Sequence, residues 1–489
     1  MLDVLDKITI AWIAIPFFIG FVAYLVPKYA RWFALGTGLV AAIYAIAIFW
    51  LNSPLEIQLL DNFGVSLLID RLSAWFILTN AFVTTAVVLY CWQTGKTTFF
   101  YMQLIILHGS VNATFICTDF ISLYVALEVI SIAAFLLIAY PRSDRSIWVG
   151  LRYLFISNTV MLFYLIGAVL VYKANNSFYY GGLTNAPVEA IALICLGLLA
   201  KGGIFASGFW LPLTHSESAS PVSAMLSGVV VKAGVFPLVR LALMLESINP
   251  IVRLFGVATA LLGVSYAIFA QDTKRTLAFS TISQLGFILA APVVGGFYAL
   301  THGLAKSALF LISGILPSRN FQELREEGIE PKIWFALVIA CLSISGGPLI
   351  AGFGAKVLTS KNLLPWQAVA MNIAAVGTAI ALAKFIFLPR QKNQAVKIQS
   401  GFWWAMIILL GGLIGANYVD GSVYSLDNLL KNLGKIALGW FIYWSIVKKS
   451  VIKFPRRIEE FEHLIGGMSL ILILVFWMVQ LQSSVSAYF

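Results

Sequence analysis

Three charged residues lie in the middle of long apolar stretches, and they constrain what this chain can become. Glu128 stands between FISLYVAL and VISIAAFLLIAY, Lys201 follows IALICLGLLA, and Lys232 follows SAMLSGVVV. Each stretch is of the kind that fills a bilayer, where a central charge costs at least about 2.5–3.5 kcal/mol. A carboxylate and two amines in three separate spans therefore indicate a path for protons or cations.

The composition predicts a membrane protein. Of 489 residues, 60% are hydrophobic and only 11% are charged, against about 25% charged in a soluble chain. We ascribe the net charge of +11 to a basic excess in cytoplasmic loops rather than to nucleic-acid binding, because no long basic run occurs. The first apolar run is expected to be a retained helix rather than a cleaved signal peptide.

No metal site or cofactor is expected. None of the four cysteines forms a CxxC pair, so neither an iron–sulfur cluster nor a zinc site is predicted. They are interpreted as small apolar fillers. The four are Cys91, Cys117, Cys195 and Cys341.

An all-α polytopic fold is predicted from the apolar runs. A spanning helix needs about 20 mostly apolar residues, which predicts about 14 spans, with about 15 or 16 as alternatives. The segment 55–70 alternates apolar and polar residues and predicts a short β-hairpin outside the bilayer. The expected spans are 8–26, 33–51, 72–92, 99–118, 120–140, 149–172, 188–208, 221–243, 250–270, 276–292, 296–316, 333–358, 364–387 and 401–417, and the alternatives add 434–449 and 466–482.

Two spans contain helix breakers close to a lysine. In the seventh, Gly202 and Gly203 follow Lys201, and in the twelfth, Pro348, Gly352 and Gly354 precede Lys356. Broken helices at membrane depth are tolerated where they line a cavity, and paired breaks are typical of inverted-repeat transporters. The alternative is that Gly and Pro are simply common in membrane helices. The predicted division is N-terminal helices with the hairpin (1–98), a first five-helix inverted repeat (99–243), a second (250–387) and C-terminal helices (401–489).

Lysine and arginine are concentrated in the odd-numbered loops, which predicts that these loops are cytoplasmic and that the N-terminus faces outward. The even loops hold only Arg71, Lys173, Arg253 and Lys361. The odd loops hold Lys28, Arg31, Lys96, Arg142, Arg145, Lys274, Arg275, Arg319, Arg325, Lys332, Arg390, Lys392 and Lys397.

The buried charges are interpreted as a proton relay. Lys201 is the expected ion-pair partner of Glu128, and breaking that pair would free Lys201 to pass a proton to Lys232. The alternative is a structural pair that pins two helices together. In the eleventh span, His302 and Lys306 are spaced i, i+4 on one helix face, which favours a relay over a metal site or a packed core histidine. Lys356 would be the last membrane lysine on the path.

Four further residues are candidates for entry or exit. His215 and Glu217 lie in an expected cytoplasmic loop, where they would either form an entry funnel or cap the eighth helix. Asp119 sits at the mouth of the fifth span and is a candidate exit-side carboxylate. Lys384 lies near a helix end, where snorkelling to the interface is the alternative to function. In QDTKR, the charged residues Asp272, Lys274 and Arg275 are interpreted as structural.

These motifs resemble a known family. The stretches ISLYVALEVISIAAFLLIAY, LLAKGGIFASGFWLPLTHSESASPVSAMLSGVVVKAGVFPLVR and QDTKRTLAFSTISQLGF are similar to the antiporter-like membrane subunits of respiratory complex I and of Mrp-type cation/proton antiporters. The resemblance covers roughly residues 60–400. It implies 14 helices with two inverted five-helix repeats, each with one broken helix. It also implies that Glu128, Lys201 and Lys232 match the essential residues, His302 and Lys306 the central relay, and Lys356 the terminal position.

The branch of the family is predicted from chain length and from Lys356, which together look most like the D-type subunit of an Mrp antiporter. The predicted function is therefore proton translocation within a multisubunit Na⁺/H⁺ antiporter, with other membrane subunits as partners, in a bacterial inner membrane or a thylakoid. One alternative is a proton-pumping subunit of a redox-driven NAD(P)H or ferredoxin:quinone complex. The chain itself has no flavin, nucleotide or cluster motif. A second alternative is a scaffold subunit whose buried charges only hold helices together.

Overall fold

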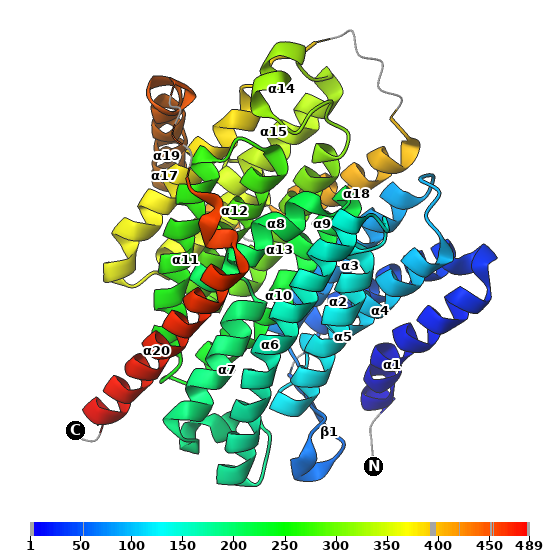
Figure 1. Cartoon of the computed structure of the whole chain (residues 1–489), viewed down its shortest axis with the longest axis vertical. Helices are drawn as coiled ribbons and strands as arrows, with labels where there is room; N and C mark the ends of the chain where they lie inside the picture. The colour runs from blue at the N-terminus through cyan, green and yellow to red at the C-terminus, as the bar shows by residue number, and fades with distance from the viewer. Residues whose placement is uncertain are drawn as a thin grey trace.

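The computed structural model describes residues 4–51, 53–391, 398–419, 421–449, 452 and 454–486. Over these ranges the chain forms a bundle of long helices. Figure 1 shows the start of α1 (Val4–Leu25), the end of α20 (Phe461–Ser486) and the strand β1 (Leu55–Gln58) at one end of the bundle, and the short helix α14 (Phe321–Glu327) at the other. Lys392 and Lys397, two of the basic residues assigned to the odd-numbered loops, lie outside the described residues.

The N-terminal part contains α1, α2 (Ala30–Phe49) and α3 (Arg71–Cys91), with the hairpin between the last two. Strand β1 pairs antiparallel with β2 (Ser66–Ile69), with Leu55 opposite Ile69. The predicted hairpin is therefore confirmed. Helix α3 begins where Asp70 accepts a hydrogen bond from the Ser73 backbone N–H at 2.9 Å, which satisfies one of the free donors at a helix start.

The next helices contain the first predicted break. Helix α7 ends at Lys201, and Gly203 then adopts φ +69°, a backbone conformation that favours glycine. Helix α8 begins only at Trp210, so the span is broken as predicted. A π-helical turn, Leu226–Val230, separates α9 from α10. The elements are α4 (Thr98–Thr114), α5 (Phe120–Ile138), α6 (Asp144–Asn175), α7 (Val188–Lys201), α8 (Trp210–Glu217), α9 (Ser220–Met225) and α10 (Val231–Met244).

The second predicted break lies between α15 and α16. Gly346 ends α15 with φ +86°, and Pro348 follows it within the break, where no helical N–H is needed. Gly352 and Gly354 belong to α16 itself, so the break is shorter than the glycine pattern predicted. The elements are α11 (Asn249–Phe269), α12 (Thr273–Ala290), α13 (Gly295–Ser313), α14, α15 (Pro331–Ser345), α16 (Ala351–Lys361) and α17 (Pro365–Ile386).

Three helices complete the described chain: α18 (Ser400–Ala416), α19 (Leu426–Ser445) and α20. Helix α19 packs against α17, and α20 returns across the bundle to pack against α7. Figure 1 shows the connection between α19 and α20 at the same end of the bundle as α14. The C-terminal residues thus contact the broken helix of the first half.

Ten of the described helices are long and apolar enough to cross a membrane, or up to 11 if the bent pair α12–α13 counts as one span. Helices α15 and α18 are apolar but shorter. Every predicted span falls on a helix or on two consecutive helices. The exact number of crossings, about 14 by the sequence argument, remains a prediction.

Candidate functional site

The buried charges come from five helices of the two central sets. Glu128 lies on α5, Lys201 at the end of α7, and Lys232 on α10. The second set supplies His302 and Lys306 from α13 and Lys356 from α16. All four lysines and the histidine are buried, while Glu128 is half-buried.

Lys201 is bound by neutral oxygens of two neighbouring helices. Its amine donates to the backbone oxygen of Leu127 at 3.1 Å, to the Ser157 hydroxyl at 2.5 Å and to the Ser131 hydroxyl. One carboxylate oxygen of Glu128 is buried without a hydrogen bond. The predicted direct ion pair is therefore wrong, although the two charges interact electrostatically. The hydroxyls of Ser131 and Ser157 bind the Lys201 amine because they lie closer to it than the Glu128 carboxylate does.

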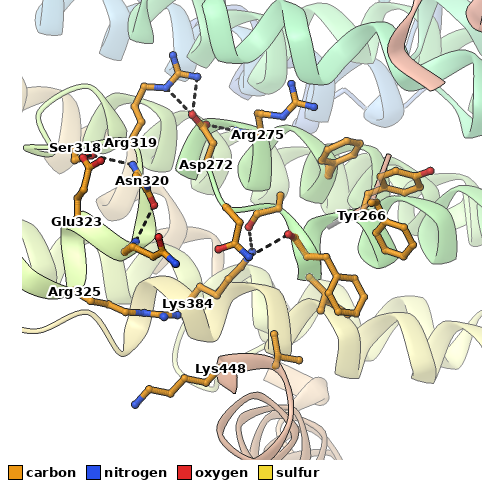
Figure 2. A pocket seen from close by; sticks show the side chains of 18 of the residues that line it. Tyr266, Asp272, Arg275, Ser318, Arg319, Asn320, Glu323, Arg325, Lys384 and Lys448 are labelled. Atoms are coloured by element: carbon orange, nitrogen blue, oxygen red, sulfur yellow. Dashed lines mark hydrogen bonds and ion pairs between the residues drawn. The ribbon is translucent and has the colours of Figure 1, made fainter. Parts of the chain in front are cut away.

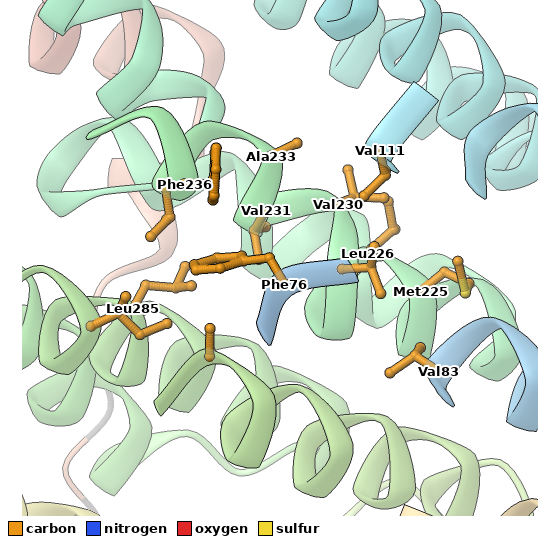
Figure 3. Packing of buried hydrophobic residues seen from close by; sticks show 14 of the residues in the cluster. Phe76, Val83, Val111, Met225, Leu226, Val230, Val231, Ala233, Phe236 and Leu285 are labelled. Carbon is orange, nitrogen blue, oxygen red and sulfur yellow. The ribbon is translucent and has the colours of Figure 1, made fainter. Parts of the chain in front are cut away.

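Within the described residues, Lys232 donates hydrogen bonds only to the turn that precedes its own helix. The amine donates to the backbone oxygens of Gly228 at 2.6 Å and Ser227 at 3.3 Å, which belong to the π-helical turn. Such turns recur at functional sites because they release carbonyl oxygens from the helix ladder. Figure 3 shows the apolar side chains around this turn, with Phe76 and Val83 from α3, Val111 from α4 and Leu285 from α12. This packing leaves the amine fully buried.

Helix α13 brings its own buried residues close to Lys232 on α10. A β-carbon built on Gly303 would lie 3.5 Å from the Lys232 amine, so α13 passes directly beside that residue. Neighbouring His302 interacts electrostatically with both Lys232 and Lys306. Lys306 donates to the Leu277 backbone oxygen at 2.9 Å and to the Ser280 hydroxyl at 2.6 Å, both on α12.

The second broken span, formed by α15 and α16, also lies next to His302. A cavity of about 10 Å³, room for about one water molecule, is lined by His302, Gln284, Tyr298, Ser343 and Gly352 among others. Both ring nitrogens of His302 and the Ser343 hydroxyl make no hydrogen bond within the described structure. The cavity therefore connects the central histidine with the helix pair that carries the last lysine.

Lys356 has a different environment from the other lysines. Its amine lies 4.6 Å from the centre of the Phe287 ring and makes no hydrogen bond in the described part of the chain. Its aliphatic stem packs against Gly346, where a β-carbon would be 3.0 Å away. The glycine at the break therefore makes room for the lysine.

The structure corrects the position of one entry or exit candidate and removes one alternative for another. His215 is inside α8 and fully buried, with neither ring nitrogen hydrogen-bonded, so the prediction that it lies in a loop is wrong. Helix α8 continues the span beyond the break, which carries the histidine into the bundle. Lys384 is also buried, and its amine donates to the backbone oxygens of Ala267 at 2.8 Å and Ala270 at 2.7 Å. These bonds exclude snorkelling in this structure.

The other two candidates are carboxylates with clear partners. Asp119 caps α5: its oxygens accept the backbone N–H groups of Ser122 at 2.7 Å and Ser66 at 2.9 Å. Glu217, which was also predicted to lie in a loop, is instead the last residue of α8 and pairs with Arg145 at 3.3 Å. Asp272 caps α12 by accepting the Arg275 N–H at 2.9 Å, as the structural interpretation of that motif predicted.

Sequence reasoning missed the oxygen atoms that receive the amines. Ser131 and Ser280 lie on the same helices as residues already singled out, but Ser157 lies on α6, which carries no predicted site residue. Ser131 follows Glu128 by three residues, and this i, i+3 spacing places both on one face. That spacing was the sequence feature that could have identified Ser131 as part of the site. Nothing local marks Ser157, because only tertiary packing brings it to Lys201.

Taken together, the site is a row of buried amines held by neutral oxygens. The predicted relay residues make no hydrogen bonds to one another; hydroxyls, backbone oxygens and one small cavity separate them. The described residues include no cluster of His, Cys, Asp or Glu that would hold a metal ion. An amine in such a setting can exchange a proton with a neighbour through a water molecule or a side-chain rotation. Fold and site thus define a helical membrane protein of the ion-translocating kind.

Comparison with known proteins identifies the family. The profile described as "NADH:quinone oxidoreductase/Mrp antiporter, TM" matches residues 117–381, and the chain belongs to this family. It is therefore an integral, multi-pass membrane protein. A curated relative, NAD(P)H-quinone oxidoreductase chain 4-2 of Synechocystis sp., is 27% identical over 410 residues, which are 74% of this chain and 73% of the relative.

Solved structures share the fold. A chain in the structure of the Mrp complex from Dietzia sp. aligns with a TM-score of 0.74 at 19% identity, covering 91% of this chain and 99% of that one. A chain of respiratory complex I from Thermus thermophilus aligns with a TM-score of 0.71 at 21% identity, covering 88% and 99%. The predicted all-α fold of this family is thereby confirmed.

Proposed function

We propose that this chain is a proton-translocating component, of the D type, in a multisubunit Na⁺/H⁺ antiporter. Protons move laterally near mid-membrane through Glu128, Lys201, Lys232, His302–Lys306 and Lys356. The N-terminus faces outward, and residues 99–243 and 250–387 form the two inverted repeats. The partners are other membrane subunits in a bacterial inner membrane or a thylakoid.

One observation carries the proposal: in the described part of the chain, the four lysines are buried without an ion pair to any acidic side chain. Burying an unpaired charge is costly, and a scaffold has no use for four such groups. Groups that alternate between charged and neutral forms explain the arrangement. The likeness to a chain of the Mrp complex supports the antiporter.

A second candidate is a proton-pumping subunit of a redox-driven NAD(P)H-quinone oxidoreductase. It is favoured by the likeness to NAD(P)H-quinone oxidoreductase chains such as chain 4-2 of Synechocystis sp.. It uses the same path through this chain and differs only in the source of energy, which would lie in other subunits.

The test uses everted vesicles that hold the whole complex. A pH gradient is imposed, and its collapse is recorded on adding Na⁺, Li⁺ or K⁺, for the wild type and for Glu128→Gln, which keeps the shape of the side chain. Collapse with Na⁺ in the wild type only is the expected result. Proton uptake driven by an electron donor, with no response to cations, would favour the second candidate. Equal transport in wild type and variant would refute the proposed path.

A further inference from the structure

A cavity of about 640 Å³ lies apart from the relay, at the end of the bundle that holds α14. It is lined by the ends of α11 and α17, the start of α12, α14, and the segment between α19 and α20, which supplies Phe454 and Glu459. Figure 2 shows its side chains gathered from these separate elements. The volume is in the range of small-ligand sites, about 300–1,000 Å³.

Positive charge dominates the lining. Five basic side chains face three acidic ones: Arg275, Arg319, Arg325, Lys384 and Lys448 against Asp272, Glu323 and Glu459. Two of the acids are already engaged with arginine, Asp272 with Arg319 at 2.9 Å and Glu459 with Arg275. Glu323 accepts a hydrogen bond from the Ser318 hydroxyl.

Three cations therefore remain without a carboxylate in the described part of the chain. Arg325 donates to the Tyr443 hydroxyl at 3.1 Å, and Lys448 lies 3.7 Å from the centre of the Trp444 ring. Lys384 donates only to backbone and hydroxyl oxygens, and the positive charge of Arg325 acts on it. Like charges gathered around one cavity repel each other unless an anion joins them.

The opposite wall is aromatic. The ring of Phe454 lies 4.8 Å from Tyr266 and 5.1 Å from Phe269, centre to centre. Beside the cavity, α19 exposes large apolar side chains, including Phe441 and Trp444, of the kind that face lipid. A basic lining next to an apolar surface at the end of membrane helices matches the depth at which phospholipid head groups lie.

We propose that this cavity binds the phosphate group of an anionic ligand, through Arg325 and Lys448 with the charge of Lys384 behind them. The ligand joins α14, α17 and α19 to the segment that leads into α20. An anionic phospholipid and free inorganic phosphate share this chemistry, and the aromatic wall favours the lipid. The inference is independent of the proposed proton relay.

The test is photo-crosslinking in vesicles that contain the full chain with its accompanying subunits. The probe is phosphatidylglycerol with a photoreactive group near its head, diluted into phosphatidylcholine, and crosslinked peptides are identified by mass spectrometry. Crosslinks are expected within 318–325, 443–449 and 454–455. In Arg325→Gln/Lys448→Gln they should fall about tenfold, the effect of losing roughly one charge-assisted hydrogen bond.

Two matched variants separate the site from general effects. Arg325→Lys/Lys448→Arg keeps both charges and should retain the crosslinks. Lys28→Gln/Arg142→Gln removes two exposed charges elsewhere in the predicted cytoplasmic loops and should leave them unchanged. Competition by unlabelled phosphatidylglycerol but not by inorganic phosphate would identify the lipid, and competition by phosphate would identify the free ion at the same site. Equal crosslinking in the Arg325→Gln/Lys448→Gln variant and the wild type, or none in these peptides, would overturn the proposal.

Discussion

Replacing Lys232 by methionine separates its charge from its packing. The side chain is fully buried, and its amine donates to Gly228 at 2.6 Å and Ser227 at 3.3 Å. Methionine fills almost the same volume but holds no proton. Alanine, by contrast, leaves a cavity beside the π-helical turn.

The expected changes in stability follow from this geometry. Volume-conserving core substitutions cost less than about 1.5 kcal/mol. Two carbonyl oxygens lose a donor at about 1–3 kcal/mol each, but the penalty of burying an ammonium group, several kcal/mol, disappears. These effects oppose each other, so Lys232→Met should assemble normally. Lys232→Ala adds a cavity cost of about 2–5 kcal/mol and should lower the yield.

Transport should respond differently from stability. Loss of a proton-transfer group lowers a rate by about 10²–10⁴-fold. Lys232→Met and Lys232→Ala should therefore each transport at about a hundredth of the wild-type rate or less. The assay is the initial rate of pH-gradient collapse in everted vesicles, normalised to the amount of assembled complex.

The matched control is Lys274→Met. Lys274 is also buried and donates to a backbone oxygen, that of Ser218 at 2.9 Å, but it lies at the start of α12 and is not one of the proposed relay residues. It should keep its transport rate. Wild-type transport in Lys232→Met would refute the role of Lys232, and equal loss of transport in Lys232→Met and Lys274→Met would show that the effect is not specific to the proposed relay.

Three further outcomes are expected. Ser157→Ala removes the acceptor at 2.5 Å from the Lys201 amine and should slow transport about tenfold, because a charge-assisted hydrogen bond is worth about 1.5–3 kcal/mol; an unchanged initial rate would contradict this. Gly303→Val would clash with Thr79 on α3 and crowd the Gly228 backbone oxygen of the π-helical turn, and it should cost about 1–3 kcal/mol, seen as a lower melting temperature in detergent. Asp70→Asn leaves the buried guanidinium of Arg240 without its ion pair and should destabilise by about 3–5 kcal/mol; a wild-type melting temperature would refute this.

Much of the fold was predictable because membrane helices are local features. Apolar runs of sufficient length mark the spans, and every predicted span falls on a helix or a pair of helices. The first break was predictable for the same reason: Gly203, one of the predicted helix breakers, adopts positive φ, which glycine alone adopts easily. The second break was predicted from Pro348, which lies within it, whereas the positive φ of Gly346 was not predicted and Gly352 and Gly354 belong to α16. The hairpin followed from the alternation in 55–70.

The contacts of the site were less predictable because they depend on tertiary packing. The residues of the relay were visible as charges in apolar runs, but the partner of Lys201 was wrongly predicted to be Glu128. Opposite charge is only one criterion for a partner; Ser157, from another helix, lies closer to the amine. His215 was placed in a loop because the sequence around it is polar, whereas α8 extends the broken span through it.

The π-helical turn beneath Lys232 shows a second limit. SAMLSGVVV reads as an ordinary apolar helix, and nothing in its periodicity marks the wider turn at Leu226–Val230. The turn is stabilised by contacts with α3, α12 and α13, including the Ser227–Thr281 hydrogen bond at 2.7 Å. Such local departures are decided by neighbouring helices rather than by the segment itself.

The most direct test of lateral proton movement concerns Lys306, which lies between the two halves and is fully buried. Proton flux is measured with a pH-sensitive dye in proteoliposomes that contain the assembled complex, for the wild type and for Lys306→Met. If protons cross from the first half to the second, the variant should assemble and yet carry no measurable proton flux. A wild-type flux through Lys306→Met would show that the halves do not exchange protons through α13 and would contradict the proposed path.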